Sequence, residues 1–102
     1  MDKGALYYFT VIANRNMKDP LVKALSDNGV KLLSATFGHG AAKSNQFLIA
    51  MGFVVEHKKV VITGLVKGEH KLKIFEMLAR DFGFDKPNTG IAYSIEVEKL
   101  SF

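Results

Sequence analysis

The chain has 102 residues, 48% of them hydrophobic, and carries a net charge of +4. This length suits one compact domain, and the apolar content excludes wholesale disorder. The charge excess suits an anionic metabolite but falls short of the basic stripe of a dedicated nucleic-acid binder. The absence of cysteine excludes disulfides and cysteine-based metal sites and is compatible with the cytoplasm.

The sequence predicts neither a signal peptide nor a membrane span. The N-terminal Met1-Asp2-Lys3-Gly4 leads into an aromatic run without a small-residue cleavage site. No apolar run approaches the ~20 residues that are needed to cross a bilayer. We therefore expect a cytoplasmic protein that is not itself membrane-spanning.

The first third of the chain predicts a strand, a helix and a second strand. Residues 5–13 are aromatic, β-branched and almost continuously apolar, as in a central strand that is covered on both faces. Residues 19–28 predict a short amphipathic helix, with Asp19 as N-cap before a proline and Asn28-Gly29 as its stop. Residues 30–37 predict the second strand.

Two segments follow whose roles the sequence leaves open. Residues 36–45 contain two glycines one residue apart, then a lysine, a serine and an asparagine. Backbone N–H groups in such a loop can turn toward an anion, but a polar connection also uses glycine simply to turn. Residues 47–55 form an apolar block. It is either packed in the core or at a subunit interface, or it is an exposed docking element.

The rest of the chain predicts a strand, a helix and a last strand. Residues 60–66 are apolar on both faces. The second helix opens at Gly68 and ends at Gly83. Its expected apolar stripe consists of Leu72, Phe75, Leu78 with Ala79, and Phe82. Residues 85–90 form a dense turn, and residues 91–100 predict the last strand. The side chains expected on one face of that strand are Ile91, Tyr93, Ile95 and Val97.

This order is β-α-β-β-α-β, a ferredoxin-like split βαβ arrangement of the α+β class. Right-handed crossovers place both helices on one face of a four-stranded antiparallel sheet, with the first and third strands in the middle. These two strands are apolar on both faces, yet the helices cover only one. Because an exposed apolar sheet face is an aggregation hazard, we predict a homo-oligomer that closes through that face.

Three features together resemble the PII-like signalling proteins, the superfamily of nitrogen-regulatory PII. They are the order of elements, the Gly38-His39-Gly40 loop after the second strand, and residues 85–97, DKPNTGIAYSIEV. The most specific piece is the Pro-x-x-Gly-Ile-Ala-aromatic run at residues 87–93. The resemblance covers nearly all of a single domain, residues 1–102. It implies a homotrimer whose sheets face its axis and a T-loop at about residues 38–57.

The resemblance also implies an effector site between neighbouring subunits, walled by the base of the T-loop and the turn before the last strand. At such a site, backbone N–H groups and a lysine would hold a phosphate or another anion. Either Lys58 or Lys59 would make the phosphate contact. The full set of expected effector-binding residues is Gly38, His39, Gly40, Lys43, Lys58, Lys59, Thr89 and Gly90. The expected effector is an adenine nucleotide or bicarbonate, as part of signal transduction.

The sequence departs from the standard PII pattern in three places. Residues 41–57 contain no tyrosine for nucleotidylation, no arginine-bearing tail precedes the end at Phe102, and Ile91 replaces a lysine. These departures leave open a ligand other than ATP, such as an adenine mononucleotide, a cyclic dinucleotide or bicarbonate. The T-loop is also unusually apolar, which suits docking onto a membrane transporter or an enzyme target. The expected docking residues are Phe47, Leu48, Met51 and Phe53.

Three other functions are weaker matches. CutA-type metal-binding trimers have a similar fold, but His39, His57 and His70 show no paired ligand spacing, so we predict no metal site. An RRM-type RNA-binding domain needs aromatic residues on its third strand and a Lys/Arg-Gly-aromatic motif, and both are absent. We therefore expect no nucleic-acid partner. No nucleophile–base pair or carboxylate pair is visible at a glycine loop, so we expect no enzyme.

Overall fold

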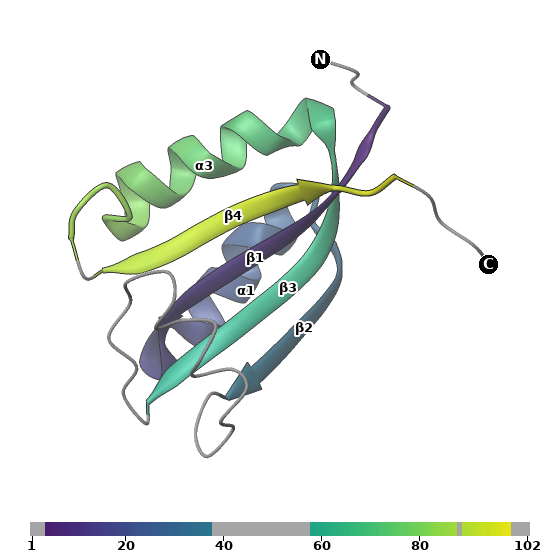
Figure 1. The fold of residues 1–102 in the computed structure, drawn as a ribbon. Coiled ribbons are helices and arrows are strands. Elements are labelled where there is room, and N and C mark those ends of the chain that lie inside the picture. Colours follow the sequence, from purple (N-terminus) through teal and green to yellow (C-terminus); the bar gives the residue numbers. More distant parts are fainter. Residues whose placement is uncertain (1–3, 38–57, 88, 99–102) are drawn as a thin grey trace.

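The structure is a computed structural model that describes residues 4–37, 58–87 and 89–98. Its elements confirm the predicted order (Figure 1). They are β1 (Leu6–Asn14), the 3-10 helix η1 (Arg15–Met17), α1 (Lys18–Asp27), β2 (Lys31–Phe37), β3 (Lys59–Lys67), α3 (Gly68–Phe82) and β4 (Gly90–Glu96). The strand ends differ from the predicted ones by a few residues, most of all in β4, which ends at Glu96.

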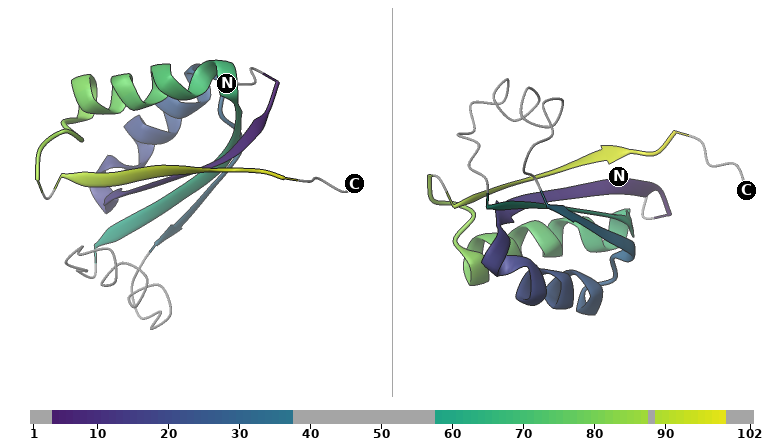
Figure 2. Two further views of the ribbon diagram at one scale, coloured as in Figure 1. Left: turned by 45° about the horizontal axis from the view of Figure 1, so that its top comes forward. Right: turned by 90° about the horizontal axis from the view of Figure 1, so that it is seen from below.

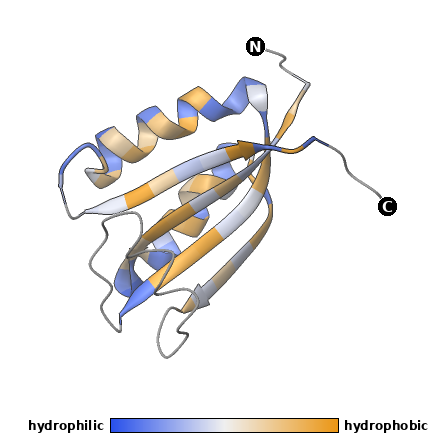
Figure 3. Cartoon of the chain, viewed as in Figure 1, coloured by the Kyte–Doolittle hydropathy of each residue, from blue (hydrophilic) through white to orange (hydrophobic). Residues whose placement is uncertain are grey.

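The strands form one four-stranded sheet in the order β2-β3-β1-β4, and every neighbouring pair is antiparallel. The two most apolar strands, β1 and β3, therefore occupy the centre, as predicted (Figure 3). Figure 2 shows that α1 and α3 lie side by side on one face of this sheet. The other face carries neither of these two helices.

The core lies between the sheet and the two helices. Alternate residues of β1 enter it, and Phe9 and Val11 are almost completely buried. The ring of Phe9 lies 5.0 Å from that of Phe75 on α3, a tilted aromatic contact. The helices contribute Leu21, Leu25, Ile74, Met77 and Leu78. This burial is what holds α1 and α3 against the sheet.

Two details of the helices differ from the prediction. Asp19 is not the N-cap, because Met17 occupies that position and makes no side-chain cap; Asp19 lies in the first turn, where a carboxylate still favours the helix dipole. Leu72 is 68% exposed, and the buried stripe of α3 includes Ile74 and Met77 instead. The predicted stops are confirmed, since Gly29 and Gly83 both have positive φ.

We call the helix-free side of the sheet the open face. The strand register places the side chains of Tyr8, Thr10 and Ile12 on it, beside residues of both neighbouring strands. These neighbours are Val61, Thr63, Leu65, Ile91, Tyr93 and Ile95. The predicted orientation of the last strand is therefore confirmed. Tyr8 is 42% exposed and Ile95 is 59% exposed, so part of this apolar face meets solvent in a single chain.

Candidate functional site

The strand register brings the described part of the predicted effector site to one end of the sheet. Asn14 at the end of β1 pairs with Lys59 at the start of β3, and Ala13 pairs with Gly90 at the start of β4. Because β1 lies between its two neighbours, Lys59 and Gly90 are two strand spacings apart, roughly 10 Å. The lysines and the turn before β4 thus flank the same end of β1 within one chain.

The two candidate lysines have different surroundings. Lys59 is only 6% exposed, and its Nζ donates a hydrogen bond to Asn14 Oδ1 at 2.8 Å. Lys58 is exposed and lines a hollow at this end of the sheet. A buried ammonium needs a close polar partner, and Asn14 supplies one. Lys58 is therefore the lysine that is accessible from solvent, whereas Lys59 joins β3 to the end of β1.

The hollow beside Lys58 has a volume of about 620 Å³, and its other described lining residues are Asn14, Arg15 and Asn16. The described lining residues are thus one arginine, one lysine and two asparagines, and none of them carries a carboxylate. Guanidinium groups bind planar anions with two parallel hydrogen bonds, and ammonium groups add a point charge. This arrangement is suited to a small anion.

Arg15 is the residue that sequence reasoning missed. The first strand is predicted to end at residue 13, and no role is predicted for the run Asn14-Arg15-Asn16 that follows, although a basic residue between two asparagines at a strand end is a usable signal. The structure gives Arg15 two contacts that no local pattern reveals. Its backbone N–H donates to the carbonyl oxygen of Lys58 at 2.6 Å, and its guanidinium carbon lies 4.5 Å from the centroid of the Phe37 ring.

These two contacts place Arg15 against both ends of the segment that the sequence predicts to be the T-loop. Phe37 is the residue before this segment, and Lys58 is the residue after it. Arg15 itself begins η1, directly after the central strand β1. A group bound in the hollow would therefore lie next to the point where residues 38–57 leave and rejoin the sheet.

The turn before β4 is held by local packing. Lys86 N–H donates to the carbonyl oxygen of Gly83 at 3.0 Å, and Phe84 N–H donates to that of Leu78 at 3.1 Å. A Cβ at Gly90 would lie 2.5 Å from Cζ of Phe84, so the ring covers this glycine directly. Thr89 and Gly90 are partly exposed, which leaves their backbone accessible at the start of the strand.

The other predicted site residues fall outside the described residues. These are Gly38, His39, Gly40 and Lys43 of the effector set and Phe47, Leu48, Met51 and Phe53 of the docking set. His70 is described, and its Nε2 lies 3.5 Å from Glu69 Oε1 at the start of α3. Within residues 4–37, 58–87 and 89–98, no group of three His, Asp or Glu side chains could hold a metal ion. The helices of this same part are too short or too polar to cross a membrane.

No family model matches the sequence, and no curated protein matches it. Solved structures do match. A Thermus thermophilus protein described as PII-like signalling has 22% identity and a TM-score of 0.65, over 95% of this chain and 90% of that one. The chain has the PII-like fold.

Two further structures share the PII-like fold. CPII, a nitrogen regulatory PII-like protein from Thiomonas intermedia K12 bound to ADP, AMP and bicarbonate, has 17% identity and a TM-score of 0.62, over 95% of this chain and 97% of that one. The B. subtilis GlnK–ATP complex has 17% identity and a TM-score of 0.64, over 95% of this chain and 85% of that one. The resemblance inferred from the sequence is therefore confirmed at the level of the fold.

Proposed function

We propose that this protein is a PII-like regulatory protein, a single domain over residues 1–102 that assembles as a homotrimer. It binds a small anionic effector between subunits and controls a partner through its T-loop, residues 38–57. The observation that carries this proposal is the position of Arg15. This residue lines the anion-suited hollow, and it also contacts Phe37 and Lys58 at the two ends of the T-loop segment.

The chemistry of the hollow supports an adenine nucleotide or bicarbonate as the effector. Its described charged groups, Arg15 and Lys58, are both cationic, and its carboxamides can donate or accept hydrogen bonds. Proteins of the same fold have been crystallised with such ligands, since CPII is bound to ADP, AMP and bicarbonate and GlnK is bound to ATP. Each of these ligands presents oxygen anions that a guanidinium and an ammonium can bind together.

Arg15 also suggests how effector binding reaches the T-loop. The guanidinium of Arg15 lies over the ring of Phe37, while the N–H edge of a guanidinium is what binds an anion. An effector that draws this edge into the hollow reorients the guanidinium and so changes the support of Phe37. Binding then shifts the loop between states, provided that the effector binds one state more tightly. The partner, a membrane transporter or an enzyme target in the cytoplasm, would dock on Phe47, Leu48, Met51 and Phe53, and the protein itself performs no catalysis.

The open face supports the homotrimer. Its exposed apolar side chains include Tyr8 and Ile95, which flank the centre of the sheet. Burying apolar surface contributes ~25 cal/mol per Å² removed from water, so a face of this composition gains from association. Closed symmetry removes it from solvent in every copy at once. Clefts between neighbouring copies are then formed at the sheet ends where Arg15 and Lys58 lie.

Isothermal titration calorimetry with ATP, ADP, AMP and bicarbonate tests the proposal. We expect saturable binding of at least one of them, and a loss of affinity of about tenfold or more in Arg15→Gln, because charge-assisted hydrogen bonds contribute ~1.5–3 kcal/mol. Lys58→Gln should weaken binding in the same direction. Lys73→Gln, which removes an exposed lysine of α3, is the matched control and should leave affinity unchanged. The absence of a binding signal with all four ligands, or equal affinity in all variants, would count against the effector site.

A further inference from the structure

Asn14 and Lys59 form a fixed pair at the edge of the hollow beside Lys58. They are directly opposite each other in the pairing of β1 with β3, so their side chains leave the sheet on the same face and lie next to each other. Lys59 is 6% exposed, and its Nζ donates to Asn14 Oδ1 at 2.8 Å. Asn14 is exposed and lines the hollow. The pair therefore links a buried ammonium to a group that a ligand in the hollow can reach.

The bond from Lys59 fixes which end of the Asn14 carboxamide is free to face a ligand. An ammonium group only donates hydrogen bonds, so it binds the oxygen of the carboxamide and not the NH2 group. The oxygen and the nitrogen point in different directions from the same carbon, so the NH2 group is directed away from Lys59. No described residue accepts a hydrogen bond from Nδ2. Two N–H donors of Asn14 are thus available at the hollow.

Local structure does not account for this orientation. Asn14 is the N-cap of η1, a position where an asparagine oxygen usually accepts a hydrogen bond from a backbone N–H of the helix that follows. The side chain of Asn14 makes no such bond. Its oxygen instead accepts from a residue 45 positions further along the chain. The pairing of two strands, and not the start of η1, therefore decides where the carboxamide points.

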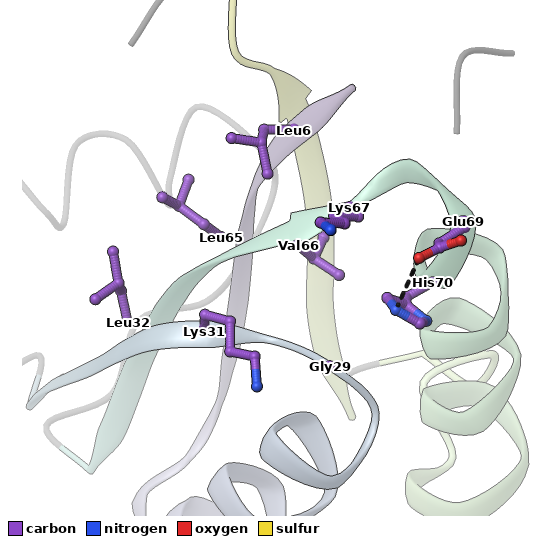
Figure 4. Close-up of a pocket in the computed structure, with 9 residues that line it drawn as sticks. All are labelled: Leu6, Gly29, Lys31, Leu32, Leu65, Val66, Lys67, Glu69 and His70. Atoms are coloured by element: carbon purple, nitrogen blue, oxygen red, sulfur yellow. Dashed lines mark ion pairs between the residues drawn. The ribbon is translucent and has the colours of Figure 1, made fainter. Parts of the chain in front are cut away.

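A comparison within the chain shows what the pair adds. A second hollow, of about 450 Å³, lies at the opposite end of the sheet and also has two lysines in its lining, Lys31 and Lys67 (Figure 4). Its described lining residues include no carboxamide, and they do include the carboxylate of Glu69. Of the two hollows, the one beside Lys58 therefore combines cationic side chains with a neutral donor of fixed orientation.

We propose that Lys59 is a positioning residue that makes Asn14 Nδ2 a fixed donor to an oxygen of the effector. This inference rests on the proposed effector site and specifies its chemistry. The group bound there is a fully ionised oxyanion of the phosphate type, because its oxygens meet N–H donors from Arg15, Lys58 and Asn14. In the proposed homotrimer the sheet ends border the clefts between subunits, so Asn14 stays accessible to the ligand.

Calorimetric titration of the full chain with pyrophosphate tests the proposal in two Asn14 variants. Asn14→Asp keeps an oxygen for Lys59 but places a second oxygen where the NH2 group was. Its Tm should stay equal or rise, because the bond from the ammonium gains a charged acceptor. Its pyrophosphate affinity should fall about thirtyfold or more, because a donor becomes a negative charge. Asn14→Ala should lose affinity about threefold to tenfold and should also lose stability. A purely structural role would instead make affinity follow stability.

Two further variants separate orientation from charge. Lys59→Met removes the ammonium that orients Asn14 and leaves an apolar side chain in a buried position. It should lower pyrophosphate affinity in the wild-type background by about threefold more than it does in Asn14→Ala, where no carboxamide remains to be oriented. Asn16→Asp makes the same charge change in the same lining, but no described residue holds its side chain in place. We expect it to lose clearly less affinity than Asn14→Asp.

The outcomes distinguish this inference from the proposed function. The inference is overturned if the wild-type protein does not bind pyrophosphate, if Asn14→Asp and Asn16→Asp lose equal affinity, or if Lys59→Met and Asn14→Ala have additive effects. ATP, ADP, AMP and bicarbonate are titrated in parallel. If they bind equally well to the wild-type protein and to Asn14→Asp, the effector site stands and the oriented donor does not. If none of them binds while pyrophosphate gives the expected pattern, the oriented donor stands and the proposed effectors do not.

Discussion

Replacing Gly64 with alanine tests how tightly the core is packed between β3 and the start of β2. Gly64 is buried in β3 and pairs with Phe9, so its missing side chain would point into the core. An added Cβ would overlap Cγ1 of Val30 and would lie 3.0 Å from the backbone oxygen of Lys31. Val30 is 3% exposed and β-branched, so neither neighbour can move away easily.

Two effects of opposite sign decide the result. Overpacking a methyl group into a filled core costs about 1–3 kcal/mol. Replacing glycine by alanine also restricts the unfolded chain, which offsets the cost by ~0.4–1 kcal/mol. The overlap wins, and we expect the free energy of unfolding to fall by about 1–2 kcal/mol. For a domain of this size that corresponds to a loss of roughly 5–15 °C in Tm.

Urea denaturation of a double-mutant cycle with Val30→Ala checks the cause. Val30→Ala alone deletes two buried carbons and should cost ~1.6 kcal/mol or more. The double variant should be more stable than the sum of the single effects by about 1 kcal/mol, because the new methyl group occupies the space that valine left. Gly83→Ala is the control, since among the described residues its Cβ would meet only Thr89 Cγ2, at 3.7 Å, and its cost comes from a positive φ. Additive effects of Gly64→Ala and Val30→Ala would refute the packing argument.

Three further predictions concern individual polar groups. Thr10→Val should raise the free energy of unfolding by about 1 kcal/mol in urea denaturation, because Thr10 Oγ1 is buried without a hydrogen-bond partner among the described residues. Asn14→Ala should lower it by ~1–3 kcal/mol, because it removes a hydrogen-bond acceptor of the buried Lys59 ammonium. The Arg80 guanidinium, through its hydrogen bond and charge, holds the pKa of the Asp81 carboxyl below its usual range. The Asp81 carboxylate therefore binds a proton more readily in the unfolded chain than in the folded one. Its stabilising contribution to the free energy of unfolding is present at neutral pH and is lost as the pH falls below about 4. Asp81→Asn should flatten the acid limb of the stability curve, and an NMR titration of Asp81 measures the shift.

The fold was predictable because independent local signals agreed. The two strands that are apolar on both faces are the central ones, and the two predicted glycine stops have the positive φ that a helix C-terminus requires. The details that were predicted wrongly depend on how a helix is rotated about its own axis. The predicted buried stripe of α3 includes Leu72, yet the helix is rotated so that Ile74 and Met77 are buried instead. Its apolar residues are spread widely enough that periodicity alone did not fix the rotation.

The site was only partly predictable, and the reason is register. Lys58 and Lys59 are adjacent in sequence, and which of them is buried depends on the register of β3 against β1. A register shift of one residue would exchange the two lysines, and the amino-acid composition of the segment cannot distinguish the two registers. The pairing of Asn14 with Lys59 decides it. Arg15 was missed because both of its informative contacts are with residues more than 20 positions away, Phe37 and Lys58. No window of sequence around Arg15 contains either of them.

The topology itself explains why these residues meet. In an antiparallel sheet with β1 between β3 and β4, the end of β1 must lie beside the starts of both neighbours. A basic residue directly after β1 is therefore brought to the beginning of β3, where residues 38–57 rejoin the sheet. Arg15 stands at this junction directly after a strand that is hydrogen-bonded on both sides, and its backbone N–H bonds to Lys58. In the proposed mechanism, a bound anion reorients the Arg15 side chain and alters the support of Phe37, while the backbone contact with Lys58 and the sheet itself stay unchanged.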